Sequence, residues 1–217
     1  MTAVKGFPRL RRNQRKAFGL LDRGCGFLWG PPGTGKTYTL GAMLAHYLCV
    51  NLEHKVLLLS TTNSSVDQAL ISMDKSLEEL SKVEGQALTL RKKCLRIGNH
   101  FIAGNYRGRE HLLPAQDEQL VRRLAELEAT MPDPADVGSY AIWKDQVRAL
   151  RQQVPKPIAQ ARLAAMTTTS AAFHFETLHA RKPFDLIVFD EASQVSIPHA
   201  LAFAPLGRKV LFAGDDQ

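Results

Sequence analysis

A glycine-rich segment of eight residues limits the fold of this chain more than any other part of its sequence. Residues 30–37 read GPPGTGKT, which satisfies the spacing G-x-x-x-x-G-K-[ST]. The apolar Phe27, Leu28 and Trp29 before it predict a short buried strand, and residues 37–50 after it predict a mostly apolar helix. Glycines at such a junction let backbone N–H groups converge on phosphates, and the helix N-terminus adds a positive dipole. The sequence therefore predicts a phosphate-binding loop, since a chance match in such a chain has odds of roughly one in a hundred.

Two side chains of this loop have defined chemistry. The Lys36 ammonium would face the β- and γ-phosphates of a nucleotide, and the Thr37 hydroxyl would bind Mg²⁺. The residues expected to bind the nucleotide are Gly30, Pro31, Pro32, Gly33, Thr34, Gly35, Lys36 and Thr37.

A second motif supplies the acids that such a loop needs. Residues 184–191 read FDLIVFDE, and the run 186–189 predicts a strand buried on both faces. This strand delivers Asp190 and Glu191 at its carboxyl end, where parallel sheets bind their ligands. We expect Asp190 to bind Mg²⁺ and Glu191 to act as the catalytic base that orients the attacking water. Alone, the motif would more often be a solvated strand end; after a phosphate-binding loop it is a strong signal.

Length and charge narrow the class of protein. The chain has 217 residues, 45% of them hydrophobic, which excludes disorder and suits one sizeable core. Its net charge of +7 favours polyanionic partners such as nucleic acid, although a soluble basic enzyme remains an alternative.

The cysteines and the N-terminus bear on the compartment. Cys25, Cys49 and Cys94 have neither zinc-ligand nor disulfide-framework spacing, and the seven histidines form no metal-binding pair. No apolar run suits a signal peptide or reaches the roughly 20 residues of a membrane span. We therefore expect a cytoplasmic protein without a membrane contact, or a nuclear one in a eukaryote. An organelle transit peptide is a weaker alternative, because the Arg-rich start contains no serine.

Hydroxyl side chains follow two further strand patterns. Residues 55–71 read KVLLLSTTNSSVDQALI, which predicts a strand at 56–59, a polar turn and an amphipathic helix. Residues 165–170, AMTTTS, repeat the arrangement. The hydroxyls could simply cap the helices, or they could hold a phosphodiester backbone together with backbone amides.

Taken in order, these segments resemble a known family. The set is LRRNQRKAF, GPPGTGKT, VLLLSTTNSSVDQAL, AMTTTS, FDEASQ and LFAGDDQ, and it covers nearly the whole chain. It is similar to the first RecA-like lobe of superfamily 1 helicases, specifically the 1B branch that includes RNA-surveillance and DNA-replication helicases. The resemblance implies an α/β P-loop fold with a doubly wound parallel sheet, ATP and Mg²⁺ as cofactors, and single-stranded DNA or RNA as partner.

The resemblance also assigns residues. Gln14 would read the adenine edge, although members usually have Asn where this chain has Arg11. Gln194 and Asp215 would couple the phosphate site to the nucleic-acid groove. That groove would be lined by Thr61, Thr62, Asn63, Ser64, Thr168 and Ser170.

The end of the sequence adds an expectation about activity. The family pattern G-D-x-x-Q-L begins at Gly214, so its glutamine would be residue 218. By the resemblance, a second RecA-like lobe with an arginine finger is missing, and such a finger is worth roughly 10³–10⁵ in rate. We therefore expect the chain alone to bind Mg²⁺-nucleotide, hydrolyse it slowly and unwind no duplex.

The middle of the chain predicts an insertion. We expect residues 1–71 and 164–217 to form the ATP-binding lobe and residues 72–163 an insertion with a strand at 94–97. Two apolar stripes across a Pro/Gly turn predict an antiparallel helical hairpin, the stalk of the resembled family, or alternatively two helices packed on the main sheet. The stripes are Leu120, Leu124, Leu127, Met131 and Trp143, Val147, Leu150, Val154. Candidate phosphate contacts, or a solvated charged face, are Arg91, Lys92, Lys93, Arg107 and Arg109.

The sequence thus predicts the ATP-binding first lobe of a helicase, which in the intact enzyme couples hydrolysis to translocation on a single strand. One alternative is a nucleotide-gated nucleic-acid-binding or regulatory module without motor activity. Another is a P-loop NTPase that does not act on nucleic acid. The choice between DNA and RNA and the oligomeric state stay open.

Overall fold

The computed structural model describes residues 7–98, 100–113, 118–152, 158 and 161–215. Its centre is a six-stranded sheet in the order β1-β6-β5-β2-β4-β3, in which every neighbouring pair is parallel. The strands are β1 Cys25–Trp29, β2 Val56–Ser60, β3 Cys94–Arg96, β4 Leu163–Thr167, β5 Leu186–Phe189 and β6 Val210–Gly214. The predicted α/β fold with a parallel sheet is confirmed.

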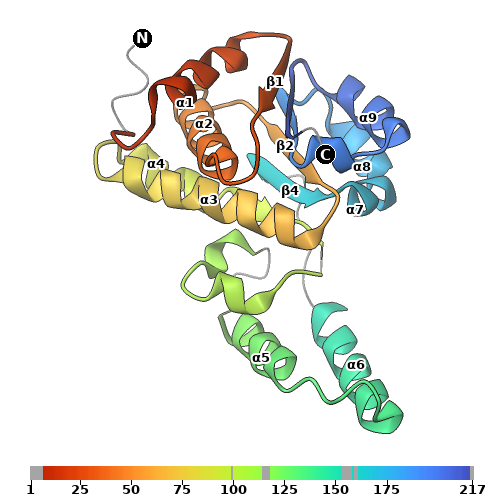
Figure 1. The fold of residues 1–217 in the computed structure, drawn as a ribbon. Coiled ribbons are helices and arrows are strands. Elements are labelled where there is room, and N and C mark those ends of the chain that lie inside the picture. Colours follow the sequence, from red (N-terminus) through yellow and green to blue (C-terminus); the bar gives the residue numbers. More distant parts are fainter. Residues whose placement is uncertain (1–6, 99, 114–117, 153–157, 159–160, 216–217) are drawn as a thin grey trace.

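Helices cover both faces of the sheet (Figure 1). One layer holds α2 Lys36–Val50, α3 Asn63–Ser81 and α4 Gln86–Arg91, and the other holds α7 Thr168–Phe173, α8 Phe175–Arg181 and α9 Ile197–Phe203. In β2, Val56 and Leu58 join the core under α2 and α3, while Leu57 and Leu59 join the core under α8 and α9. The continuous apolar run of this strand is explained by burial on both faces.

The first strand is less buried than the sequence predicts. The strand predicted at 27–29 is present, but Phe27 is 69% exposed and Trp29 is 62% exposed, so the prediction that it is buried is wrong. The physical reason is that one face of β1 is uncovered: Cys25, Phe27 and Trp29 alternate on the exposed face, whereas Gly26 is buried on the other. Phe27 stacks on Phe212 of β6, with ring centroids 5.3 Å apart.

Two helices project from the sheet below α3 (Figure 1): α5 Glu118–Ala129 and α6 Val137–Gln152. The 3₁₀ turns Ala103–Tyr106 and Glu110–Leu112 lie before them. Leu124 on α5 and Val147 on α6 are buried in one cluster, and the Trp143 indole Nε1 donates to the Leu127 carbonyl oxygen at 2.7 Å. The predicted helical hairpin is therefore present. Met131 is 54% exposed and does not extend the apolar stripe, and Val154 lies outside the described residues.

The predicted division at 1–71, 72–163 and 164–217 stays a prediction. Helix α3 runs without interruption through residue 72, and β3 pairs with β4 as a strand of the main sheet. Among the described residues, no helix is long and apolar enough to cross a membrane.

Candidate functional site

The GPPGTGKT segment forms a compact loop between β1 and α2. Gly33 and Gly35 have φ of 80° and 82°, a region that glycine adopts without strain. The Thr34 hydroxyl donates to the Pro31 carbonyl at 2.8 Å and closes the turn. A Cβ atom at Gly30 would come within 2.8 Å of that hydroxyl, so this glycine permits the close approach. The loop ends where α2 begins, with the first N–H groups of the helix at its rim.

The Lys36 ammonium is held above this loop. Its Nζ donates to the Gly30 carbonyl oxygen at 3.2 Å and lies 3.6 Å from Asp215 Oδ2. Both side chains are mostly buried, and they meet because β6, which ends in Gly214, pairs directly with β1. The ammonium thus occupies the position from which it could neutralise a phosphate bound by the loop.

A buried carboxylate lies at the end of β5. Asp190 is 3% exposed, and its Oδ1 has no hydrogen-bond partner among the described residues. Burial raises the pKa of Asp190 to about 6, and the Glu191 carboxylate adds to the rise. A buried oxygen without a donor suits a hard divalent cation, so Asp190 together with the Thr37 hydroxyl fits Mg²⁺. The described residues contain no cluster of three or more His, Cys, Asp or Glu side chains for a metal. Phosphates and water would therefore complete the coordination.

Glu191 follows in a strained backbone conformation. Its φ of 50° lies in the left-handed region, which is uncommon outside glycine and costs of order 1–3 kcal/mol. The strain turns the chain sharply from β5 into the 3₁₀ turn Ala192–Gln194. A glycine at position 191 would adopt this conformation without strain, so the presence of glutamate there is consistent with a role for its side chain.

Beside the loop is a cavity of ≈ 580 Å³ that suits the base and sugar of a nucleotide. The predicted residues Gln14, Gly30, Pro31, Thr34 and Lys36 line it, together with Arg11 and Trp29. Gln14 Oε1 accepts from the Arg11 N–H at 2.8 Å, and Gln14 Nε2 donates to the Thr34 carbonyl at 3.3 Å. Pro32, Gly33, Gly35 and Thr37 belong to the loop but are not among the lining residues.

A short series of contacts leads from the loop to the neighbouring strands. Asp215, which pairs with Lys36, accepts a hydrogen bond from the Ser193 hydroxyl at 3.3 Å. The adjacent Gln194 accepts from the Thr61 hydroxyl at 3.1 Å, at the end of β2. Gly214 lets these segments approach, because a Cβ there would lie 3.1 Å from the Ala192 amide nitrogen. The sequence assigned no role to Ser193, although its place between Glu191 and Gln194 was a signal.

A second cavity, of ≈ 780 Å³, lies at the carboxyl ends of β2, β4 and β3. Four residues predicted for a groove, Thr61, Thr62, Asn63 and Ser170, line it. Thr168 does not, because it is 3% exposed, and its neighbour Thr169 lines the cavity instead. Ser64 also does not; its hydroxyl accepts from Gln68 Nε2 at 3.4 Å. The sequence missed the other lining residues, which are Arg96, Gly98, His100, Thr167, Phe173 and His174.

The comparisons with known proteins agree with this geometry. A family model described as an AAA domain matches residues 14–217. The chain belongs to this family. It is 25% identical to the DNA polymerase alpha-associated DNA helicase A of Saccharomyces cerevisiae, over 99% of this chain and 33% of that protein. It is 26% identical to the regulator of nonsense transcripts 1 of Caenorhabditis elegans, over 98% of this chain and 18% of that protein. An uncharacterized ATP-dependent helicase of Methanocaldococcus jannaschii is 24% identical, over 91% of this chain and 35% of its own.

The resemblance to superfamily 1 helicases is thereby confirmed for this AAA domain. The domain spans about a third or less of the length of these relatives.

A buried arginine organises the wall of the second cavity in the AAA domain. Arg96 is 1% exposed, and its Nε donates to Asp67 Oδ1 at 2.7 Å. Its Nη2 donates to Asn63 Oδ1, also at 2.7 Å, and so fixes the side chain of a predicted groove residue. The Tyr106 hydroxyl donates to the same Asp67 oxygen. Sequence reasoning missed Arg96 because a basic residue in a short apolar strand gives no sign of a buried partner on a distant helix.

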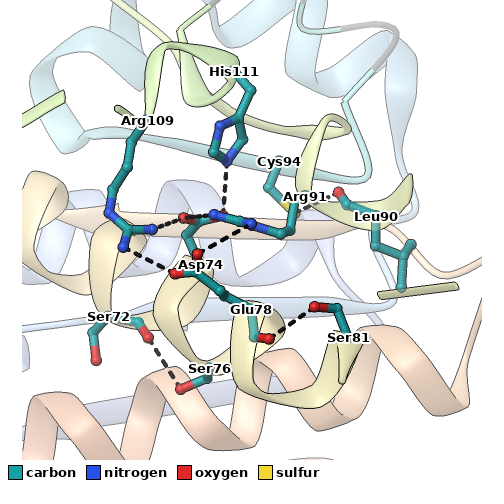
Figure 2. A network of polar contacts seen from close by, with 10 residues as sticks. All are labelled: Ser72, Asp74, Ser76, Glu78, Ser81, Leu90, Arg91, Cys94, Arg109 and His111. Atoms are coloured by element: carbon teal, nitrogen blue, oxygen red, sulfur yellow. Dashed lines mark hydrogen bonds and ion pairs between the residues drawn. The ribbon is translucent and has the colours of Figure 1, made fainter. Parts of the chain in front are cut away.

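Two predicted phosphate contacts have a structural partner instead. Arg91 donates to both carboxylate oxygens of Asp74, at 2.7 and 2.8 Å, and Arg109 pairs with Asp74 and Glu78 (Figure 2). The His111 Nε2 atom lies 2.9 Å from the same carboxylate. Asp74 is fully buried, so these cations neutralise it and are not free for phosphates. The remaining candidates, Lys92, Lys93 and Arg107, are exposed.

Proposed function

We propose that this AAA domain binds ATP with Mg²⁺ and forms the first lobe of a helicase that moves along single-stranded nucleic acid. The series of contacts from Lys36 through Asp215, Ser193 and Gln194 to Thr61 carries the proposal. It connects a phosphate-binding loop with a hydroxyl-lined cavity, as a nucleotide-driven motor requires. The names of the relatives, all of which are helicases or a regulator of transcripts, support the assignment.

Each residue of the loop region has a defined part in the proposed chemistry. Lys36 would exchange its contact with Asp215 for the β- and γ-phosphates, while Thr37 and Asp190 would hold Mg²⁺. When bound, the ion neutralises charge that develops on the phosphates during hydrolysis. Glu191 orients the attacking water, because it lies one residue after the metal-binding Asp190 at the same strand end.

The proposed coupling between the nucleotide site and the second cavity begins when Asp215 loses its ion pair with Lys36. When Lys36 turns to the phosphates, the remaining contact of Asp215 is with Ser193, next to Gln194. A shift of this turn alters the Gln194–Thr61 hydrogen bond at the wall of the second cavity. Nucleotide and nucleic acid would then each change the affinity for the other, which is the basis of translocation.

Nucleotide binding can be tested with the fluorescence of Trp29, which lines the first cavity. Titration with Mg²⁺-ATP in a Trp143→Phe background, which leaves Trp29 as the indole near the site, should give a saturable change. Lys36→Ala should weaken binding by about 10- to 100-fold, because a charge-assisted contact to phosphate contributes about 1.5–3 kcal/mol.

The matched control is Lys92→Ala, which removes an exposed lysine outside both cavities and should leave the titration curve unchanged. Identical curves for Lys36→Ala and the unsubstituted chain would rule out the phosphate role of Lys36. Binding is the suitable readout, because the chain spans only 33% of the length of the yeast relative.

A further inference from the structure

An exposed aromatic ring lies at the rim of the second cavity. Phe173, the last residue of α7, is 84% exposed and lines the cavity together with hydroxyl side chains. The hydroxyls come from two turns: Thr61 and Thr62 lie between β2 and α3, and Thr169 and Ser170 lie in the first helical turn of α7, directly after β4. The ring thus offers an apolar surface at the rim of an otherwise polar cavity, and a ligand bound in the cavity would bury this surface.

The packing of the fold does not account for this ring. Phe175, two residues later, anchors its segment, with a ring centroid 6.1 Å from that of Phe203 and 5.9 Å from that of His179. Among the described residues, no ring contact involves Phe173. Thr168 and Ala171 are the buried residues of α7, so the helix is fixed without Phe173.

The charges around the cavity indicate what kind of ligand it accepts. Among the described residues that line it there is no Asp or Glu, so an anion meets no carboxylate of these residues at the wall. Arg96, which lines the cavity, is already paired with Asp67. Burial, together with the charges of Arg151 and Arg96, lowers the pKa of His100. A phosphodiester would therefore be held mainly by hydroxyls and backbone amides. Ionic attraction alone would bind it weakly, and a further source of affinity is needed.

We propose that Phe173 is a base-stacking platform, on which one unpaired base of the bound strand lies while the hydroxyls of the two turns hold the adjacent phosphates. This inference rests on the proposed function and names a contact within it. Stacking uses the face of the ring, which every base can cover, so it provides affinity without sequence preference. The cavity volume of ≈ 780 Å³ is within the range of about 300–1,000 Å³ of ligand sites.

The test compares two ligands of equal length: oligo(dT), and the same backbone with abasic sugars at every position. Binding to the 217-residue chain is measured by fluorescence anisotropy at low salt. Phe173→Ala should weaken oligo(dT) binding by about 5- to 150-fold, the range found for loss of one base–aromatic stack. Its affinity for the abasic strand should stay unchanged, because no base is present to stack. Phe173→Leu should behave like Phe173→Ala, and Phe173→Trp should bind oligo(dT) with quenched indole fluorescence.

A salt titration distinguishes stacking from a phosphate contact. Phe173→Ala should leave the slope of log affinity against log salt unchanged, whereas loss of one phosphate contact would lower it by about 0.7. The control is Val83→Ala, which removes an 80% exposed apolar side chain beyond the far end of α3, a helix about 28 Å long.

The outcomes separate this inference from the proposed function. If the unsubstituted chain binds oligo(dT) and Phe173→Ala binds it equally, the stacking role is wrong and the proposed function stands. Equal losses for oligo(dT) and the abasic strand would also overturn the stacking role. If the unsubstituted chain binds neither strand, the nucleic-acid part of the proposed function fails, and the stacking role fails with it.

Discussion

At the scale of single residues, the buried carboxylate of Asp190 should destabilise the metal-free fold, although the proposed function needs it to bind Mg²⁺. Its carboxylate is buried and has an oxygen without a donor among the described residues, which raises its pKa to about 6. Because the pKa in the folded state is higher than in the unfolded chain, the contribution of Asp190 to the stability of the metal-free domain is fully present only below about pH 4. This contribution, up to about 3 kcal/mol, should be lost as the pH rises through 6. Asp190→Asn should remove this dependence and raise the free energy of unfolding at pH 7.5 by about 1–3 kcal/mol, as measured by urea titration with a chelator.

Magnesium supplies the matching control for Asp190. Adding Mg²⁺-nucleotide should stabilise the unsubstituted domain and stabilise Asp190→Asn much less, because the carboxamide is a poor ligand for the ion. The inference would be wrong if, in the absence of metal, Asp190→Asn were less stable than the unsubstituted domain at every pH. The buried charge of Asp190 would then not destabilise the fold.

At the scale of elements, α3 joins the sheet to the projecting segment through two buried carboxylates. Asp67 accepts hydrogen bonds from Arg96 and Tyr106. Asp74 accepts hydrogen bonds from Arg91 and Arg109, as Figure 2 shows. Burial alone would raise the pKa of Asp74, but hydrogen bonds from Arg91 and His111 hold it well below its ordinary value. Asp74→Asn should therefore lower the free energy of unfolding by about 2–4 kcal/mol at pH 7, because two mostly buried guanidinium groups lose their counter-charge.

The matched control for Asp74 is Asp145→Asn, which breaks an exposed pair with Arg148 on α6 and should cost less than about 1 kcal/mol. The sign of the pH effect also follows. A depressed pKa stabilises the fold above the ordinary pKa of aspartate, and this stabilisation is lost as the pH falls toward the folded-state pKa. In urea titrations from pH 7 to 3, the free energy of unfolding should fall more steeply for the unsubstituted domain than for Asp74→Asn. Equal dependence on pH in the two proteins would contradict the role of Asp74.

At the scale of the whole molecule, the two cavities are connected through the turn after β5. Ser193→Ala removes the contact to Asp215 without touching the lining of the cavity at Thr61. Binding of oligo(dT) by the unsubstituted domain should change by about 5- to 150-fold when Mg²⁺-nucleotide is added, a typical size for such coupling. In Ser193→Ala this factor should fall toward one, while the affinity for each ligand alone changes little.

The control for this coupling is Ser196→Ala. Ser196 is also an exposed serine of the same segment, but its hydroxyl contacts His199 rather than Asp215. It should leave the coupling factor unchanged. Because coupling is reciprocal, nucleotide affinity measured with and without oligo(dT) must give the same factor. A factor equal in Ser193→Ala and the unsubstituted domain would exclude the proposed path.

Local chemistry explains which parts of the site the sequence predicts. The loop at residues 30–37 and the strand end at Asp190 depend on residue types at fixed spacing, so they follow from the sequence directly. The prediction of strands at 56–59 and 186–189 succeeds because continuous apolar runs are typical of strands buried on both faces. The burial of β1 is predicted less accurately: Phe27 is exposed because one face of this strand is left uncovered, which an apolar run in the sequence does not reveal.

The sequence by itself thus determined the parallel α/β fold, the phosphate-binding loop and the acids opposite it, because these depend on neighbours along the chain. Only the tertiary structure decided that Thr169 rather than Thr168 faces the second cavity, and that Phe173 stands exposed at its rim. It also decided that Arg91 neutralises Asp74 rather than a phosphate. The physical reason is that burial and charge pairing are set by side chains far apart in sequence, whose contacts exist only once the sheet and its helices have assembled.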